Sequence, residues 1–273
     1  ALLAETAGLP HSPQRQTLLV RLHTGLADNA IYRGDLVQAA LHVDRLHPIL
    51  DDAEPVERQH ALEIVIEVST RRGDFAQARA ALESGRRENP ANVTWNVYAA
   101  MLAWSEMRLD DAIAGFAQVL RDHPDHARYV MVENDHAVAL WARGDVAAAE
   151  HWLRRGLTTW AGVPHAQCLS RMNLAAVLTC QGRAQEAAAE LHAAHQLALD
   201  QHSRLFEGEC QHRLGRLQLQ CGQAPAARRS LDRALGCLSA DQDPVRVAQW
   251  RACAALAALA DGDLQAARSF MAQ

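Results

Sequence analysis

The 273-residue sequence predicts an all-α protein, a right-handed superhelix of about seven helix pairs. A six-residue stretch, Gly34 to Ala39, returns along the chain and ends each time in alanine. These alanines are separated by 39, 34, 37, 38, 40 and 40 residues, the period of a helical repeat array. Hydrophobic residues make up 49% of the chain but aromatic residues only 5%, which suits many closely packed, alanine-rich helices. The recurring alanines are Ala39, Ala78, Ala112, Ala149, Ala187, Ala227 and Ala267.

Each recurring stretch predicts a tight turn between a helix A and a helix B. Its glycine suits the left-handed residue that ends a helix, and an aspartate directly after it can cap the next helix. The Gly-Asp pair occurs at 34–35, 73–74, 144–145 and 262–263. A degenerate copy has Met107 in place of the glycine.

The two helices of each pair carry complementary residues. A large apolar residue follows each recurring alanine by four positions, on the same face of helix B. Helix A carries, seven residues before the turn, a residue that is small in six of the seven copies. The large residues are Val43, Leu82, Phe116, Leu153, Leu191, Leu231 and Met271. The helix A partners are Ala27, Ile66, Ala100, Ala137, Ala175, Gly215 and Ala255.

Prolines separate most helix pairs and suggest the repeat boundaries. Residues 1–13 are interpreted as the tail of an upstream segment, and residues 14–273 as one repeat domain. Because the chain begins at Ala1 and stops inside the last repeat, we interpret it as part of a longer protein. The expected repeats are 20–55, 59–92, 93–126, 130–164, 168–203, 208–243 and 248–273.

The pattern of small residue, turn, alanine, large residue and proline resembles the tetratricopeptide repeat (TPR). Leu214-Gly215 match the Leu-Gly of its helix A, and Ala112, Phe116 and Pro124 match residues of its helix B. The resemblance covers about residues 14–273, although most steps exceed 34 residues and the helix A tryptophan of the family is absent from most copies. The longer repeats resemble the helical-repeat domain of bacterial MalT-like transcriptional regulators.

The resemblance implies that A helices line a concave groove and present the residues that bind a partner. In the sixth repeat the groove positions hold Glu209, His212 and Arg216. Trp104 and Trp141 occupy the same position in adjacent repeats, and Trp is common at interaction hot spots. The alternative is that both tryptophans are core residues. The candidate groove residues are Tyr98, Met101, Trp104, Asn134, Asp135, Val138, Trp141, Met172 and Asn173.

Composition argues against several other functions. The net charge is −5 and basic residues are scattered, so this segment is not expected to bind nucleic acid. The chain contains no lysine, which excludes a P-loop lysine and a Schiff base. No catalytic motif is present, and we expect no enzyme activity.

Metal ions, cofactors and membranes are not expected either. Each of the histidine pairs, 123/126 and 192/195, is too small for a zinc site. Six cysteines without a C-x-x-C motif suggest free thiols and a reducing, cytoplasmic setting. No apolar run approaches about 18 residues, the length of a membrane span.

The sequence thus predicts a non-catalytic binding domain, the sensory or scaffold part of a larger bacterial transcriptional regulator. Its partner would be a protein or peptide segment, or a small effector, held in the concave groove. The alternative is a purely structural scaffold that forms homo-oligomers.

Overall fold

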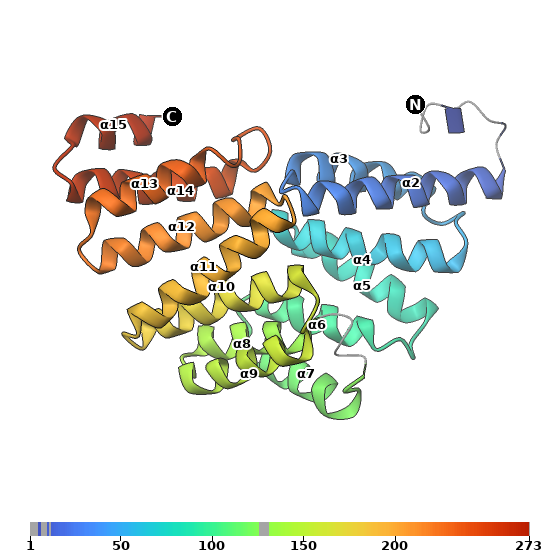
Figure 1. The fold of residues 1–273 in the computed structure, drawn as a ribbon. Helices are drawn as coiled ribbons and strands as arrows, with labels where there is room; N and C mark the ends of the chain where they lie inside the picture. Colours follow the sequence, from blue (N-terminus) through green and yellow to red (C-terminus); the bar gives the residue numbers. More distant parts are fainter. Residues whose placement is uncertain (1–4, 7–9, 11, 126–130, 273) are drawn as a thin grey trace. The chain divides into compact units, whose positions relative to one another are not determined.

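The computed structural model describes residues 5–6, 10, 12–125 and 131–272. These residues contain fourteen α-helices and one short 3-10 helix but no β-strand (Figure 1). The helices form seven pairs, which confirms the all-α class and the number of repeats. The chain divides into two compact units, residues 1–126 with three pairs and residues 127–273 with four.

Unit 1 contains the first three pairs, in each of which helix A precedes helix B. A 3-10 helix, His47–Ile49, follows the first pair. The pairs are α2 (Pro13–Tyr32) with α3 (Leu36–Leu46), α4 (Pro55–Arg72) with α5 (Phe75–Glu88), and α6 (Thr94–Ser105) with α7 (Leu109–Asp122).

Unit 2 contains the other four pairs in the same order. Three of its A helices have 17 residues, whereas α6 and α8 have 12. These additional helical turns explain why the later repeats exceed 34 residues. The pairs are α8 (Val132–Arg143) with α9 (Val146–Thr159), α10 (Pro164–Cys180) with α11 (Ala184–Asp200), α12 (Arg204–Gln220) with α13 (Ala224–Leu235), and α14 (Pro244–Ala260) with α15 (Leu264–Ala272).

The turn within each pair has the conformation that the sequence predicts. All six turn glycines have positive φ, between 71° and 98°. In each of the seven turns the residue after the glycine position donates its backbone N–H to the carbonyl five residues earlier, at 2.8 to 3.0 Å, as in a Schellman motif. The four Gly-Asp copies also use the aspartate carboxylate as helix cap, for example Asp74 Oδ1 with the N–H of Gln77 at 3.1 Å. Sequence and hydrogen bonding therefore agree at every turn.

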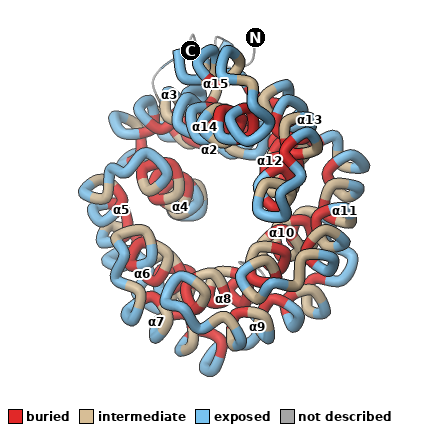
Figure 2. The backbone as a smooth tube through the Cα atoms, turned by 90° about the vertical axis from the view of Figure 1, so that its left-hand side faces the viewer, coloured by how far each residue is buried: buried red, intermediate tan, exposed pale blue. Residues whose placement is uncertain are grey.

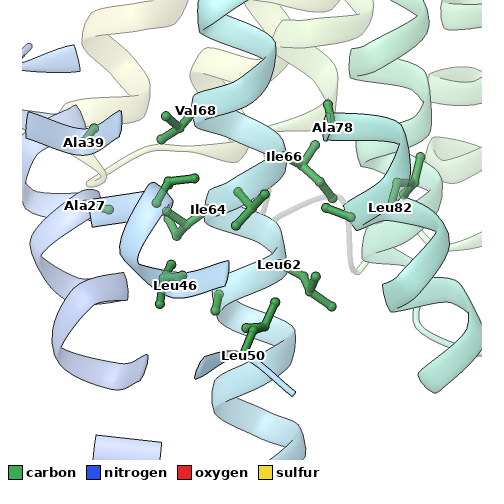
Figure 3. Close-up of a cluster of buried hydrophobic side chains, with 14 of the residues drawn as sticks. Ala27, Ala39, Leu46, Leu50, Leu62, Ile64, Ile66, Val68, Ala78 and Leu82 are labelled. Atoms are coloured by element: carbon green, nitrogen blue, oxygen red, sulfur yellow. The ribbon is translucent and has the colours of Figure 1, made fainter. Parts of the chain in front are cut away.

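Small residues hold the two helices of each pair together, as predicted. The seven recurring alanines are at most 5% exposed, and the helix A residues opposite them are buried too. Figure 3 shows this packing in unit 1, where Ala27, Ile66 and Ala78 lie among larger aliphatic side chains. The large residues that follow the alanines are also buried in the first six pairs. In the seventh pair, Met271 is 71% exposed because no further helix covers α15 in this structure.

Two tryptophans that the repeat pattern does not single out form part of the core. Trp95 and Trp250 are each 1% exposed. Each indole packs on a glycine, because a Cβ at Gly85 would lie 2.4 Å from Trp95 and one at Gly208 would lie 2.5 Å from Trp250. Both glycines thus provide space for a ring at the contact with the next repeat.

Several expectations concern residues that the structure does not fully describe. Much of the predicted tail 1–13 lies outside the described residues, as do residues 126–130 at the boundary between the third and fourth repeats. The repeat boundaries therefore stay predictions. Pro55, Pro164 and Pro244 begin α4, α10 and α14, where proline is tolerated at the first helical position.

The degenerate turn at Met107 predicts a stabilising substitution. Met107 has φ 61° and is 72% exposed, so it adopts the left-handed conformation without burying its side chain. Replacing it with glycine should raise the free energy of unfolding by about 0.5–1 kcal/mol. Glycine relieves the backbone strain at this position, and part of that gain is offset because glycine increases the conformational entropy of the unfolded chain. Urea unfolding measures this change. Gly144→Ala is the opposite control and should lose about 1 kcal/mol, because its φ is 98° while a Cβ there meets no atom within 4 Å. Equal stability of Met107→Gly and the parent chain would contradict the strain argument.

The packing of helix A on helix B predicts opposite effects for two glycine substitutions. A methyl group on Gly215 would lie 2.6 Å from Cγ of the buried Leu231, so Gly215→Ala should cost about 1–3 kcal/mol of stability by overpacking. A methyl group on Gly25, inside α2, would meet no atom within 4 Å. Gly25→Ala should therefore stabilise the protein by about 0.5–1 kcal/mol through helix propensity. Thermal melts of the two variants that shift in the same direction would refute the predicted contact.

Candidate functional site

The A helices of unit 2 form one continuous face. Helix α8 contacts α10, α10 contacts α12, and α12 contacts α14, and each of the four also contacts its own B helix. Figure 2 shows the A helices α10 and α12 on one side and the B helix α11 on the other, with buried positions where they meet. Residues 37 to 41 positions apart on successive A helices are thereby brought side by side, and we call this surface the A face of unit 2.

A chain of polar side chains connects three of these helices. Nδ2 of Asn173 on α10 donates to Oδ1 of Asn134 on α8, at 2.9 Å. Nη1 of Arg213 on α12 donates to Oδ1 of Asn173 at 3.1 Å and to the carbonyl oxygen of Met172 at 2.9 Å. Asn134 also donates from Nδ2 to Oδ1 of Asp135, at 3.1 Å. Buried polar groups need such partners, and these bonds set the register of one A helix against the next.

An acidic side chain between α12 and α14 is neutralised from two directions. Glu209 accepts a hydrogen bond from Nη1 of Arg246 on α14, and its Oε2 lies 3.9 Å from Nε of Arg213 on its own helix. Arg246 also pairs with Asp243, with 2.9 Å between Nε and Oδ2. The charges of Glu209 and Arg213 are therefore compensated by partners within the protein.

His212 lies beside this network and is almost fully covered. Its ring stacks on Trp250 with 5.8 Å between centroids, and its Nε2 lies 3.3 Å from Sγ of Cys253. Burial of the imidazole, and then the positive charges of Arg216 and Arg213, lower the pKa of His212 to about 4. The ring is thus neutral at pH 7.

A cavity of about 370 Å³ opens on the A face among these groups. All four A helices contribute to its lining, with Trp141 from α8 and Gln249 from α14. The indole N–H of Trp141 donates to Sγ of Cys180 at 3.4 Å, which orients the ring. The cavity combines aromatic and aliphatic walls with a few polar groups, the usual composition of a ligand site. Its polar groups on α12 are Glu209, His212, Arg213, Arg216 and Gln220.

Comparison with known proteins supports the repeat assignment. Residues 70–134 match the sequence model described as tetratricopeptide repeat, and helix pairs of the same kind continue on both sides of that segment. The matched segment is thus tetratricopeptide repeat, and the other described helix pairs share its two-helix architecture. No curated protein matches it by sequence.

Several solved TPR-like structures share its fold. A Rap protein complexed with competence and sporulation factor has a TM-score of 0.66 and 10% identity, over 95% of this chain and 75% of that one. NprR in complex with its cognate peptide NprX has a TM-score of 0.64 and 13% identity, over 99% and 80%. PilW, a type IV pilus biogenesis factor, has a TM-score of 0.59 and 20% identity, over 79% and 91%. At these identities the similarity concerns the fold alone.

The structure brings together part of the predicted set of site residues. Within the repeats of unit 2, Trp141 lines the cavity, and Asn134, Asp135 and Asn173 belong to the polar chain beside it. Val138 is half-buried on α8. Met172 differs from the expectation, because its side chain is 1% exposed and lies in the core, so that only its carbonyl oxygen takes part, as the acceptor for Arg213.

The other predicted residues lie in unit 1. Tyr98, Met101 and Trp104 follow one another at three-residue spacing on α6, the A helix of the third repeat. Tyr98 and Met101 are half-buried, and Trp104 is 38% exposed. Trp104 and Trp141 are thus less buried than the core tryptophans Trp95, on α6, and Trp250, on α14.

Sequence reasoning missed several residues of the cavity. Arg213, Gln249 and Trp250 are among them. Arg213 stands one repeat step of 40 residues after Asn173. An alignment of successive A helices, continued past the fifth repeat, identifies this position. In contrast, Glu209, His212 and Arg216 occupy predicted groove positions and do line the cavity.

Two other properties concern the described part of the chain. None of its helices is long and apolar enough to span a lipid bilayer. The six cysteines are free thiols, of which Cys168, Cys210 and Cys237 are buried.

Two buried histidines predict a loss of stability in mild acid. The pKa of His212 is lowered to about 4, and burial followed by the charge of Arg143 lowers the pKa of His136 to about 4 as well. Between pH 6.5 and about 4 the unfolded chain binds more protons at these sites than the folded one, so stability falls as the pH falls. From pH 7 to pH 5 each histidine should remove about 1–2 kcal/mol from the free energy of unfolding.

Urea unfolding at pH 7, 6 and 5 measures this effect. His212→Gln should reduce the pH dependence by the contribution of one histidine, whereas the same change at the exposed His192 should leave it intact. An unchanged pH dependence in His212→Gln would contradict the assignment of a neutral, buried ring.

Proposed function

We propose that this TPR array is a non-catalytic binding domain that holds an extended segment of a partner protein or peptide on the A face of unit 2. The observation that carries the proposal is the cavity on that face, which is lined by Trp141 of α8 and by polar groups of α12. Two proteins of similar fold are complexed with a cognate peptide and with competence and sporulation factor, which favours a peptide segment as partner over a small effector. The wider setting that we propose is a larger bacterial transcriptional regulator in the cytoplasm, in which this array is the sensory or scaffold part.

The polar chain beside the cavity supports the same proposal. An amide side chain has two N–H donors and two acceptor lone pairs. Asn173 uses one donor for Asn134 and one acceptor position for Arg213, and the residue is only half-buried. Its second N–H is therefore available to a peptide carbonyl. Because Asn134 is 6% exposed, we assign it the role of positioning Asn173.

Unit 1 offers a second surface of the same kind. Tyr98, Met101 and Trp104 give α6 a partly exposed apolar stripe. We propose that this stripe binds a further part of the same partner, since exposed aromatic side chains on a TPR helix A are suited to this role.

A structural scaffold is the second candidate function, and a different observation favours it. The last pair exposes Leu256, Leu259, Leu264 and Met271, by 49% to 71%. Earlier B helices bury the residue equivalent to Met271, so this end face is suited to covering by another helix. Sedimentation velocity distinguishes the two functions, because a scaffold should sediment as a concentration-dependent oligomer that Met271→Glu disrupts.

Truncation of Trp141 tests the binding proposal. Peptides selected from fluorescein-labelled hexapeptide pools should bind the chain, and Trp141→Ala should weaken them by about 2 kcal/mol, roughly 30-fold, the scale of an interface hot spot. The melting temperature should fall only slightly, because Trp141 is half-buried. Trp152 is a matched control: it is also half-buried but lies on the B helix α9.

Fluorescence polarisation measures the affinity and calorimetry the stability of each variant. Trp152→Ala should leave the affinity unchanged. Equal losses of affinity in the two variants would show that Trp141 acts through stability alone and would remove the A face from the proposal.

Trp104→Ala, measured in parallel, should also weaken binding if α6 takes part, and an unchanged affinity would exclude the stripe on α6.

A further inference from the structure

Two buried cysteines face each other where α10 packs on α12. The hydrogen bonds from Arg213 to Met172 and to Asn173 match residues of the two helices at steps of 41 and 40. Cys168 and Cys210 each lie about one helical turn before this contact, and they are separated by 42 positions. The register of the two helices therefore places one thiol opposite the other.

The two thiols form a hydrogen-bonded pair. Sγ of Cys168 donates to the carbonyl oxygen of Ala194 on α11, at 3.3 Å, and its side chain also hydrogen-bonds that of Cys210. Because the Cys168 proton points to Ala194, the S–H of Cys210 is the donor to the sulfur of Cys168. Cys168 is 0% exposed and Cys210 is 1% exposed, so the packing around them holds the two sulfur atoms together.

The pair is asymmetric in its acidity. The hydrogen bond from Cys210 lowers the pKa of Cys168, an effect that burial opposes and the positive charge of Arg213 supports. The hydrogen bond to Cys168, together with burial, raises the pKa of Cys210. The thiolate is the form of cysteine that reacts with oxidants. Cys168 is therefore the sulfur that is oxidised first, and Cys210 is placed to attack it.

We propose that Cys168 and Cys210 are a redox-active dithiol, which a small hydroperoxide converts into a disulfide between α10 and α12. The Cys168 thiolate attacks hydrogen peroxide, which breaks the O–O bond, forms a sulfenic acid (S–OH) and releases hydroxide. The sulfur of Cys210 then attacks that of Cys168, and the hydroxyl group leaves as water with the proton of Cys210. In total, two thiols and one peroxide give one disulfide and two water molecules.

This disulfide would join two helices of the A face by a covalent bond. It would lie about one turn from the contact of Arg213 with α10 and would hold the two helices in the same register. Disulfides of cytoplasmic proteins are mostly transient and catalytic or redox-sensing. The inference goes beyond the proposed binding function and does not depend on which partner the A face holds.

Peptide mapping of the parent chain after treatment with hydrogen peroxide tests the inference. Remaining thiols are blocked with N-ethylmaleimide in denaturant, and mass spectrometry of an unreduced digest then identifies every cysteine pair. A Cys168–Cys210 disulfide should form in most molecules and should be reversed by dithiothreitol. Cys237 is the matched control, because burial, and then the charge of Glu207, raise its pKa to about 11. It should stay reduced, although at 9% exposed it is more accessible than either member of the pair.

Two variants assign the roles of the two sulfur atoms, and thermal melts confirm that both variants are folded. In Cys210→Ser, peroxide should leave Cys168 as a sulfenic acid that dimedone traps, whereas in Cys168→Ser the thiol of Cys210 should stay reduced. The map of the parent chain decides the question even where a variant unfolds. Absence of the disulfide at a peroxide dose that oxidises the exposed Cys180 and Cys221, or equal oxidation of Cys237, would overturn the inference.

Discussion

The structure depends on the close approach of helix A and helix B within each repeat. A buried alanine on helix B and, in six of the seven pairs, a small residue on helix A make that approach sterically feasible. Gly215 is the extreme case, because even a methyl group there would meet Leu231. Within each unit, successive A helices also contact one another, and in unit 2 this contact places side chains 40 residues apart within hydrogen-bonding distance. The candidate site is therefore a consequence of repeated small residues.

Local patterns let the sequence predict much of this fold. The glycine positions, the aspartate caps and the small-to-large spacing each involve residues within one repeat, and the structure confirms them. What it did not predict depends on contacts between repeats. Trp95 packs on Gly85 and Trp250 on Gly208, and neither glycine belongs to the recurring stretch. The recurring pattern reflects contacts within one helix pair. It therefore does not predict residues that pack only against the neighbouring pair.

The same distinction, between contacts within a repeat and contacts between repeats, explains which features of the candidate site the sequence predicted. Trp141 and Arg216 were predicted from their positions in the repeat, and both line the cavity. The hydrogen bond from Arg213 to Asn173 was not predictable, since it depends on the rotation of α12 against α10. Met172 shows the reverse error, because its side chain is 1% exposed at a position that the family resemblance assigns to the groove. Side-chain pairing across helices follows from packing, which a single sequence specifies only indirectly.

The central claim is that the A face of unit 2 holds the partner segment, and the indole N–H signals of the six tryptophans test it most directly. Substitution of Trp141 and of Trp152 by phenylalanine assigns their signals in a ¹⁵N-labelled sample. Titration with a bound hexapeptide should then shift the signal of Trp141, whose N–H contacts Cys180 at the cavity wall, and leave that of Trp152 on α9 unchanged. A shift of Trp152 with no change at Trp141 would place the partner on the B helices and contradict the account.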